Sequence, residues 1–85
     1  MSFRAWVRSL VGEGKKYANQ QDMADAWRMG LSTVAHYLRG SRTPDLERCI
    51  RISEAEDMSP VQIAEMVRRD AREASEEGRK VAGLT

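Results

Sequence analysis

A short stretch of the chain, residues 31–36, carries the side chains best suited to contact another molecule. The stretch lies on an expected helix whose outer side presents hydroxyl, imidazole and small apolar groups. An ordinary solvent-facing helix surface would carry Lys and Glu instead. Such groups can hydrogen-bond to base edges or pack on thymine methyl groups, and an α-helix fits the major groove of DNA. The candidate base-reading residues are Leu31, Ser32, Thr33, Ala35 and His36.

These side chains favour single rather than bidentate contacts with bases. The hydroxyls of Ser32 and Thr33 donate or accept, and His36 donates to guanine or accepts, according to its tautomer. No Arg, Asn or Gln stands among the five residues. We therefore expect specificity to depend also on DNA shape and on the Gln side chains of the preceding helix. Two alternatives stay open: His36 is an ordinary solvated residue, or Leu31 belongs to the core.

Five helices are expected to position these residues, so the fold class is predicted as all-α. Apolar residues recur at helical spacing, and no β-branched run is long enough for a strand. Ser2 and Asn19 are suited to cap helices, and Ser59 followed by Pro60 is a strong start signal. Gly40 allows the third helix to end in a left-handed residue. The expected helices cover residues 2–11, 19–27, about 31–40, 45–56 and 60–74.

Apolar spacing also predicts which side of the last two helices faces the core. In the fourth helix the expected inward residues are Leu46, Cys49, Ile50 and Ile52 or Ser53. In the fifth they are Val61, Ala64, Val67 and Ala71, flanked by Ile63 and Met66. This arc is wide for one side of a small bundle, so part of it is a candidate dimer interface, formed by Ile63, Met66 and Val67. The alternative is that the fifth helix only closes the core. Residues 76–85 are expected to form a polar C-terminal tail, in which Val81 and Leu84 are the apolar exceptions.

Length and composition exclude several classes of protein. Eighty-five residues form one small domain, and 41% hydrophobic with 32% charged residues is typical of an ordered globular chain. No apolar run approaches the roughly 20 residues that span a bilayer, so we expect no membrane partner. Cys49 is the only cysteine, which excludes an internal disulfide, and a single histidine makes a metal site a poor hypothesis. We expect a cytoplasmic protein that has no cofactor and no small-molecule substrate.

Charge is distributed unevenly, although the net charge is only +1. Residues 1–51 carry nine basic and five acidic side chains, whereas residues 52–85 carry five basic and eight acidic ones. This difference predicts a basic surface on the N-terminal part of the domain and an acidic far side. A basic surface of this kind suits an anionic partner such as DNA.

The stretch from Gln20 to Pro44 resembles the helix-turn-helix of the Cro/repressor-type (Xre-like) family. That family's pattern has a Gln before an apolar-Ala pair, a turn, a second helix with an aromatic residue, then Gly and Pro. The residues in register are Met23, Ala24, Val34, Tyr37, Gly40 and Pro44. The later segment from Leu46 to Pro60 is similar to the family's fourth and fifth helices. The resemblance implies a five-helix lambda-repressor-like fold, with residues 1–75 as the helix-turn-helix domain.

The resemblance also implies contacts with the DNA backbone. Gln20, at the start of the second expected helix, is implied to contact a phosphate or a base edge, and Asn19 stands beside it. Arg39 and Arg42 suit the next phosphates along the groove. The alternative for both arginines is a plain surface charge.

Four residues depart from the family's pattern: Arg28, Leu38, Ser53 and Glu56. Arg28 stands in the turn where the family usually has glycine, and a left-handed Arg costs on the order of 1 kcal/mol, so the conformation of this turn stays open. Glu56 stands where the family usually has Leu, which makes the end of the fourth expected helix less apolar.

These expectations combine into one function and one alternative. The first is a DNA-binding transcriptional regulator, a repressor of the type common in phages and mobile elements, which binds double-stranded DNA as a homodimer. The alternative is a protein-interaction module, such as an antitoxin or inhibitor, that keeps the fold and uses Leu31, Leu38 and the apolar arc of the fifth helix. An enzyme is not expected, because the sequence offers no matched nucleophile and base.

Overall fold

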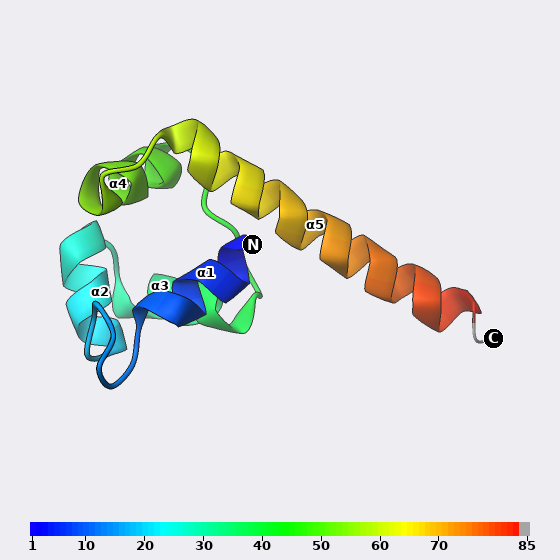
Figure 1. Ribbon diagram of the computed structural model, residues 1–85, viewed down its shortest axis with the longest axis horizontal. Helices are drawn as coiled ribbons and strands as arrows, with labels where there is room; N and C mark the ends of the chain where they lie inside the picture. Colours follow the sequence, from blue (N-terminus) through cyan, green and yellow to red (C-terminus); the bar gives the residue numbers. More distant parts are fainter. Residues whose placement is uncertain (84–85) are drawn as a thin grey trace.

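The chain folds into five α-helices, seen in the computed structural model in Figure 1. The structure describes residues 1–83, and side chains as far as Glu73. Across that range the only β-type pairing is an isolated bridge between Val11 and Tyr17, so the predicted all-α class is confirmed. The helices are α1 (Phe3–Leu10), α2 (Gln20–Trp27), α3 (Leu31–Arg39), α4 (Leu46–Glu56) and α5 (Pro60–Gly83).

Side-chain oxygens cap the starts of four helices. The Ser2 hydroxyl accepts from the backbone N–H of Ala5, and the Asn19 side chain accepts from that of Asp22, as their residue types predict. Asp45 caps α4 in the same way. The Ser59 hydroxyl accepts from the N–H of Val61, and Pro60 occupies the first position of α5. Local sequence therefore sets where these helices begin.

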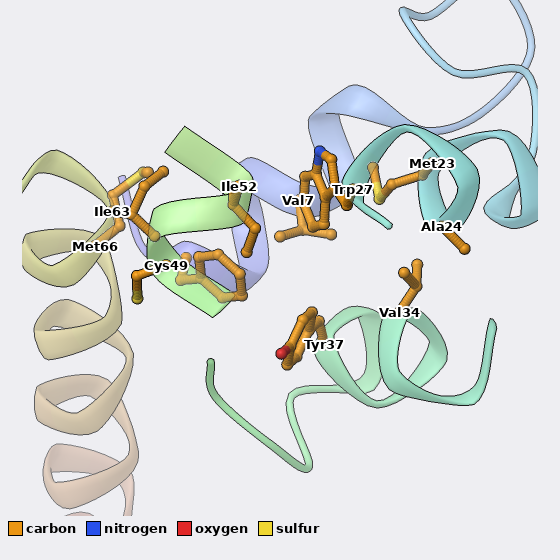
Figure 2. Close-up of a cluster of buried hydrophobic side chains, with 11 residues drawn as sticks. Val7, Met23, Ala24, Trp27, Val34, Tyr37, Cys49, Ile52, Ile63 and Met66 are labelled. Atoms are coloured by element: carbon orange, nitrogen blue, oxygen red, sulfur yellow. The ribbon is translucent and has the colours of Figure 1, made fainter. Parts of the chain in front are cut away.

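One hydrophobic cluster lies among the five helices (Figure 2). The aromatic rings form its centre: Phe3 meets Tyr37 edge-on at 5.5 Å between centroids, and Trp6 stacks on Trp27 at 6.0 Å. The α1–α3, α2–α3, α1–α5 and α4–α5 pairs pack around it. The buried members are Phe3, Val7, Met23, Ala24, Trp27, Val34, Tyr37, Cys49, Ile52, Ile63 and Met66.

The turn between α2 and α3 keeps a left-handed residue although that residue is an arginine. Arg28 has φ 56° and ψ 47°, and its N–H bonds back to α2. The conformation that the sequence left open is therefore left-handed. The Arg28 guanidinium pairs with Glu54 at 2.9 Å, and its carbonyl accepts from Arg51 at 3.3 Å. These contacts with α4 offset a backbone strain of roughly 1 kcal/mol.

Glu56, the departure at the end of α4, is buried with three hydrogen-bond donors around it. Its side chain is 3% exposed. The carboxylate accepts from the Tyr17 hydroxyl, from Trp27 Nε1 at 3.2 Å and from Lys16 Nζ at 3.0 Å. A buried charge is tolerated when it is paired and hydrogen-bonded, as here. The group joins α4 to the end of α2 and to the α1–α2 connection.

The prediction of which residues of α4 and α5 face the core was partly wrong. Cys49, Ile52 and Ser53 are buried, but Leu46 is 74% and Ile50 41% exposed. On α5, Val61 is 64% exposed, and Ala64 and Ala71 are also exposed. The residues of α5 that face the core are Ile63, Met66 and Val67.

The side of α5 that faces the core also makes a polar contact with α1. One turn beyond Met66, the Asp70 carboxylate accepts from the backbone N–H of Arg4 at 3.0 Å, in the first turn of α1. Carboxylates are favourable at a helix N-terminus, where N–H groups lack partners. This exposed polar contact lies on the same side of α5 as the buried Ile63 and Met66 and joins it to the start of α1.

The C-terminal segment is helical further than the sequence predicts. The expected fifth helix ended near Ala74, and residues 76–85 were expected to be a polar tail. The structure continues α5 to Gly83 as one helix that extends away from the other four (Figure 1). Leu84 and the side chain of Val81 lie outside the described residues.

We predict that Glu56→Ala lowers the free energy of unfolding by roughly 2–4 kcal/mol, because it leaves buried donors of Tyr17 and Trp27 without an acceptor. Urea denaturation followed by tryptophan fluorescence measures this change. Glu54→Ala is the matched control, since Glu54 forms an exposed ion pair worth about 0–1 kcal/mol. Equal losses for the two variants would contradict the assigned role of Glu56.

The Glu56 carboxylate also makes the stability of the fold depend on pH. Burial alone raises the pKa of Glu56, but hydrogen bonds from Tyr17, Lys16 and Trp27 outweigh it and leave the pKa below its ordinary value. The stabilisation is therefore complete above the ordinary Glu pKa of about 4.3 and is lost as pH falls through the lowered pKa of the folded state. Urea titrations over this range should show a shallower loss for Glu56→Gln than for the natural chain. An equal loss of stability with falling pH in the two proteins would contradict the prediction.

Glycine should be required at the end of α3 but not in the turn before it. Gly40 has φ 76°, and an added Cβ would lie 2.8 Å from Arg4 Cδ, so Gly40→Ala should cost about 1–2 kcal/mol. Gly30 is the N-cap of α3 with φ −70°, and the nearest atoms to an added Cβ are hydroxyl oxygens 3.9 Å away, so Gly30→Ala should cost only about 0.5 kcal/mol, from the poorer N-cap. Thermal unfolding of both variants distinguishes them. A greater loss at Gly30 would contradict the assignment of the left-handed turn position to Arg28.

Candidate nucleic-acid interface

Helix α3 has one side in the core and the opposite side open. Val34 and Tyr37 are buried, and Leu38 packs against the core cluster. The backbone of the helix packs closely on α1 and α2, whereas toward α4 it is side chains that meet: Tyr37 shares the core with α4 residues, and Thr33 borders Arg48 and Arg51. Its outer side therefore stays uncovered by the rest of the described chain.

The five candidate base-reading residues all lie on this open side, at different positions across it. Ser32 is exposed on the outermost ridge, with His36 half-buried one turn later. Leu31 is 46% exposed, which decides against a place in the core. Ala35 and Thr33 are half-buried on the two flanks. The helical spacing thus places all five on the half of α3 that faces away from Val34 and Tyr37.

The flank that carries Leu31 and Ala35 faces the start of α2. A groove lined by Gln20, Ala35 and Arg39 also has Arg8 of α1 in its wall. A second groove joins Gln20 to Leu31 and includes Asn19. Gln20 therefore borders α3 over more than one turn and forms a continuous surface with it.

Asn19 and Gln20 differ in what their side chains already bind. The Asn19 carbonyl oxygen accepts from the N–H of Asp22 at 2.9 Å, so its amide group is left to donate. Gln20 is exposed, and its amide bonds to no described residue. Its neighbour Gln21 is occupied, because its Nε2 donates to Asp25 at 2.9 Å. Of the two glutamines at the start of α2, Gln20 has its full side chain available for a ligand.

The opposite flank, at Thr33, borders three arginines that already have acidic partners. Thr33 shares a groove with Arg28, Arg48 and Arg51. Arg48 pairs with Asp45, Arg51 with Glu47 and Arg28 with Glu54, at 2.7–2.9 Å. Their charges are largely neutralised, so this flank attracts anions less strongly than the number of arginines suggests.

Arginines at the other end of α3 have no such partners. Arg39 and Arg42 are exposed and form no ion pair with any acid among the described residues. Arg8 was not expected at this surface, yet its Nε donates to the Leu38 carbonyl at 2.9 Å, at the C-terminal end of α3. The sequence places Arg8 on the outer side of the first helix, and this position does not indicate that Arg8 lies next to the end of α3. These three guanidinium groups make this end of the open surface basic.

His36 contacts both Arg39 and Ser41. Its Nδ1 lies 2.7 Å from the Ser41 hydroxyl and 3.3 Å from an Arg39 guanidinium nitrogen. Desolvation lowers the pKa of His36, and the charges of Arg42 and Arg39 lower it further. The imidazole is therefore neutral near pH 7. Sequence reasoning did not identify the Ser41 side chain, because its position depends on how the chain turns after Gly40.

The candidate dimer residues do not form an exposed surface in the described structure. Ile63 is fully buried, Met66 is 9% exposed, and Val67 is half-buried against the core (Figure 2). Ile63 and Met66 point from α5 toward α4 and complete the core there. The expectation that they are available to a second subunit was wrong, because their apolar area is already covered within one chain.

Comparison with known proteins identifies no relative: no family model, no curated protein and no solved structure matches this chain. Residues 1–83 include no helix with the length and apolar character needed to cross a lipid bilayer.

Proposed function

We propose that this chain is a sequence-specific regulator of transcription that binds double-stranded DNA through α3. The observation that carries the proposal is the open side of α3. Its central side chains are uncharged, whereas unpaired guanidinium groups lie at its C-terminal end and Gln20 lies along its flank. Uncharged groups suit base edges in the major groove, and guanidinium and amide groups suit the phosphates beside it.

Each residue has a role in this proposal. Ser32, Thr33 and His36 hydrogen-bond to base edges, and Leu31 and Ala35 pack on thymine methyl groups. Gln20 and Asn19 donate to a phosphate at the start of α2, where the helix dipole also favours an anion. Arg42 and Arg39 bind phosphates further along the groove.

A repressor that acts as a dimer in the cytoplasm is the form of regulator we propose. One helix with mainly single contacts reads few base pairs, and two copies related by a two-fold axis double them. The operator is then a pseudo-palindrome with half-site centres about 34 Å apart.

The alternative function, a protein-interaction module, has a smaller exposed apolar surface in the structure than the sequence predicts. It depended on Leu31, Leu38 and the apolar arc of α5. Leu38 packs against the core, and Ile63 and Met66 are buried. Of the named apolar side chains, Leu31 stays exposed on α3.

We predict that the purified chain selects a common sequence from a random pool of duplexes, and that its affinity falls as salt rises. Arg42→Ala should weaken binding to all duplexes about equally and reduce the slope of log affinity against log salt by about 1. Gel shifts over a series of salt concentrations measure both effects.

Arg68→Ala is the matched control, since Arg68 is exposed on α5, which does not contact α3. It removes the same charge and should leave the slope unchanged. Absence of any salt-dependent duplex binding would reject the proposal in favour of the interaction module.

A further inference from the structure

The contacts around His36 determine which of its two ring nitrogens carries a proton. An Arg39 guanidinium nitrogen lies 3.3 Å from Nδ1. A guanidinium group has five N–H donors and no acceptor, so a hydrogen bond between the two requires Nδ1 to accept. Nδ1 is then unprotonated, and the neutral imidazole has its hydrogen on Nε2.

Ser41 supports the same tautomer and is itself held in place by the end of α3. Gly40 is left-handed, and the backbone N–H of Ser41 bonds back to the His36 carbonyl at 3.0 Å. This turn brings the Ser41 hydroxyl to 2.7 Å from Nδ1, with the His36 carbonyl further away at 3.3 Å. Because the contact with Arg39 leaves Nδ1 without a hydrogen, the 2.7 Å contact requires the Ser41 hydroxyl to donate to Nδ1.

Nε2 is on the other side of the ring and bonds to no described residue. Its N–H is a donor on the open side of α3. In the major groove guanine presents two acceptors, O6 and N7, and no donor. Adenine and thymine present one acceptor each, N7 and O4, and cytosine presents only a donor amino group. A ring that donates from Nε2 therefore rejects cytosine and favours guanine, which has two acceptors and no competing donor. A ring with the opposite tautomer would favour the amino groups of adenine and cytosine.

We propose that Arg39 and Ser41 are positioning residues that hold His36 as the Nε2–H tautomer, so that His36 reads guanine in the operator. The reading of guanine rests on the proposed DNA-binding function, whereas the tautomer is a property of the free protein. Arg39 thereby acts on base choice as well as on phosphate. A single net hydrogen bond of this kind corresponds to roughly a 2- to 10-fold preference.

Nitrogen-15 NMR of the free, full-length chain tests the tautomer directly. His36 is the only histidine, so its imidazole signals need no assignment by mutation. At neutral pH we expect Nδ1 to show the chemical shift of an unprotonated nitrogen and Nε2 that of a protonated one. Ser41→Ala and Arg39→Ala should each shift the two signals toward the average of a tautomer mixture.

Two further variants separate positioning from general effects on the fold. Ser41→Thr keeps the hydroxyl and should keep the tautomer. Ser9→Ala makes the same change at an exposed serine of α1, whose hydroxyl bonds to the Trp6 carbonyl, and should leave the imidazole signals unchanged. An Nδ1–H ring, or a mixture in the natural chain, would overturn the inference even if the chain binds DNA.

Selection from a random duplex pool tests the reading of guanine. The natural chain should prefer guanine at one position in each half-site, by roughly 2- to 10-fold. His36→Ala and Ser41→Ala should lose this preference and keep those at other positions. A preference for guanine that survives both substitutions overturns the role of His36. An Nε2–H ring in a chain that binds no duplex overturns the proposed function and the reading of guanine, and leaves only the tautomer assignment standing.

Discussion

The buried carboxylate of Glu56 is the interaction on which the arrangement of the helices most depends. It accepts hydrogen bonds from Tyr17 in the α1–α2 connection, from Trp27 at the end of α2 and from Lys16. Burial and the carboxylate raise the pKa of Tyr17 to about 12, so its hydroxyl stays a donor. Because these donors come from different segments, one side chain holds the end of α2 against α4. The Trp27 ring, held in this way, stacks on Trp6 and joins α1 to the same core.

The turn that leads into α3 is a second constraint on the fold, and residues of α4 again make the contacts that hold it. Arg28 occupies a left-handed conformation that glycine adopts without strain. Glu54 binds its guanidinium and Arg51 binds its carbonyl, so the turn is anchored to α4 at two points. The end of α2 is thus positioned by α4, and the backbone of α3 packs closely on α1 and α2. The outer side of α3 is therefore free for the proposed contact with DNA.

Polar contacts also explain where apolar periodicity failed. The apolar residues of α5 cover so wide an arc that their spacing allows more than one inward face. In the structure the inward face is the one with Ile63 and Met66, the Asp70 contact with the start of α1 lies on that side, and Val61 points outward. On α4, Leu46 and Ile50 lie to one side of a core face that ends in Glu56. An acidic residue at the end of a buried face gives no apolar signal, so apolar spacing did not identify Glu56 as part of that face.

The sequence alone determined the number of helices, most of their starts and the open surface of α3. Capping residues such as Ser2 and Asn19 act within one turn, and the spacing of Val34 and Tyr37 defines the side of α3 that must be buried. The five side chains opposite to that side are then brought together by helical geometry. Only the tertiary structure decided the left-handed Arg28, the burial of Glu56, the inward face of α5 and the contact of Ser41 and Arg39 with His36. Each depends on a partner distant in sequence or on a turn of the backbone, and spacing along one helix contains no information about either.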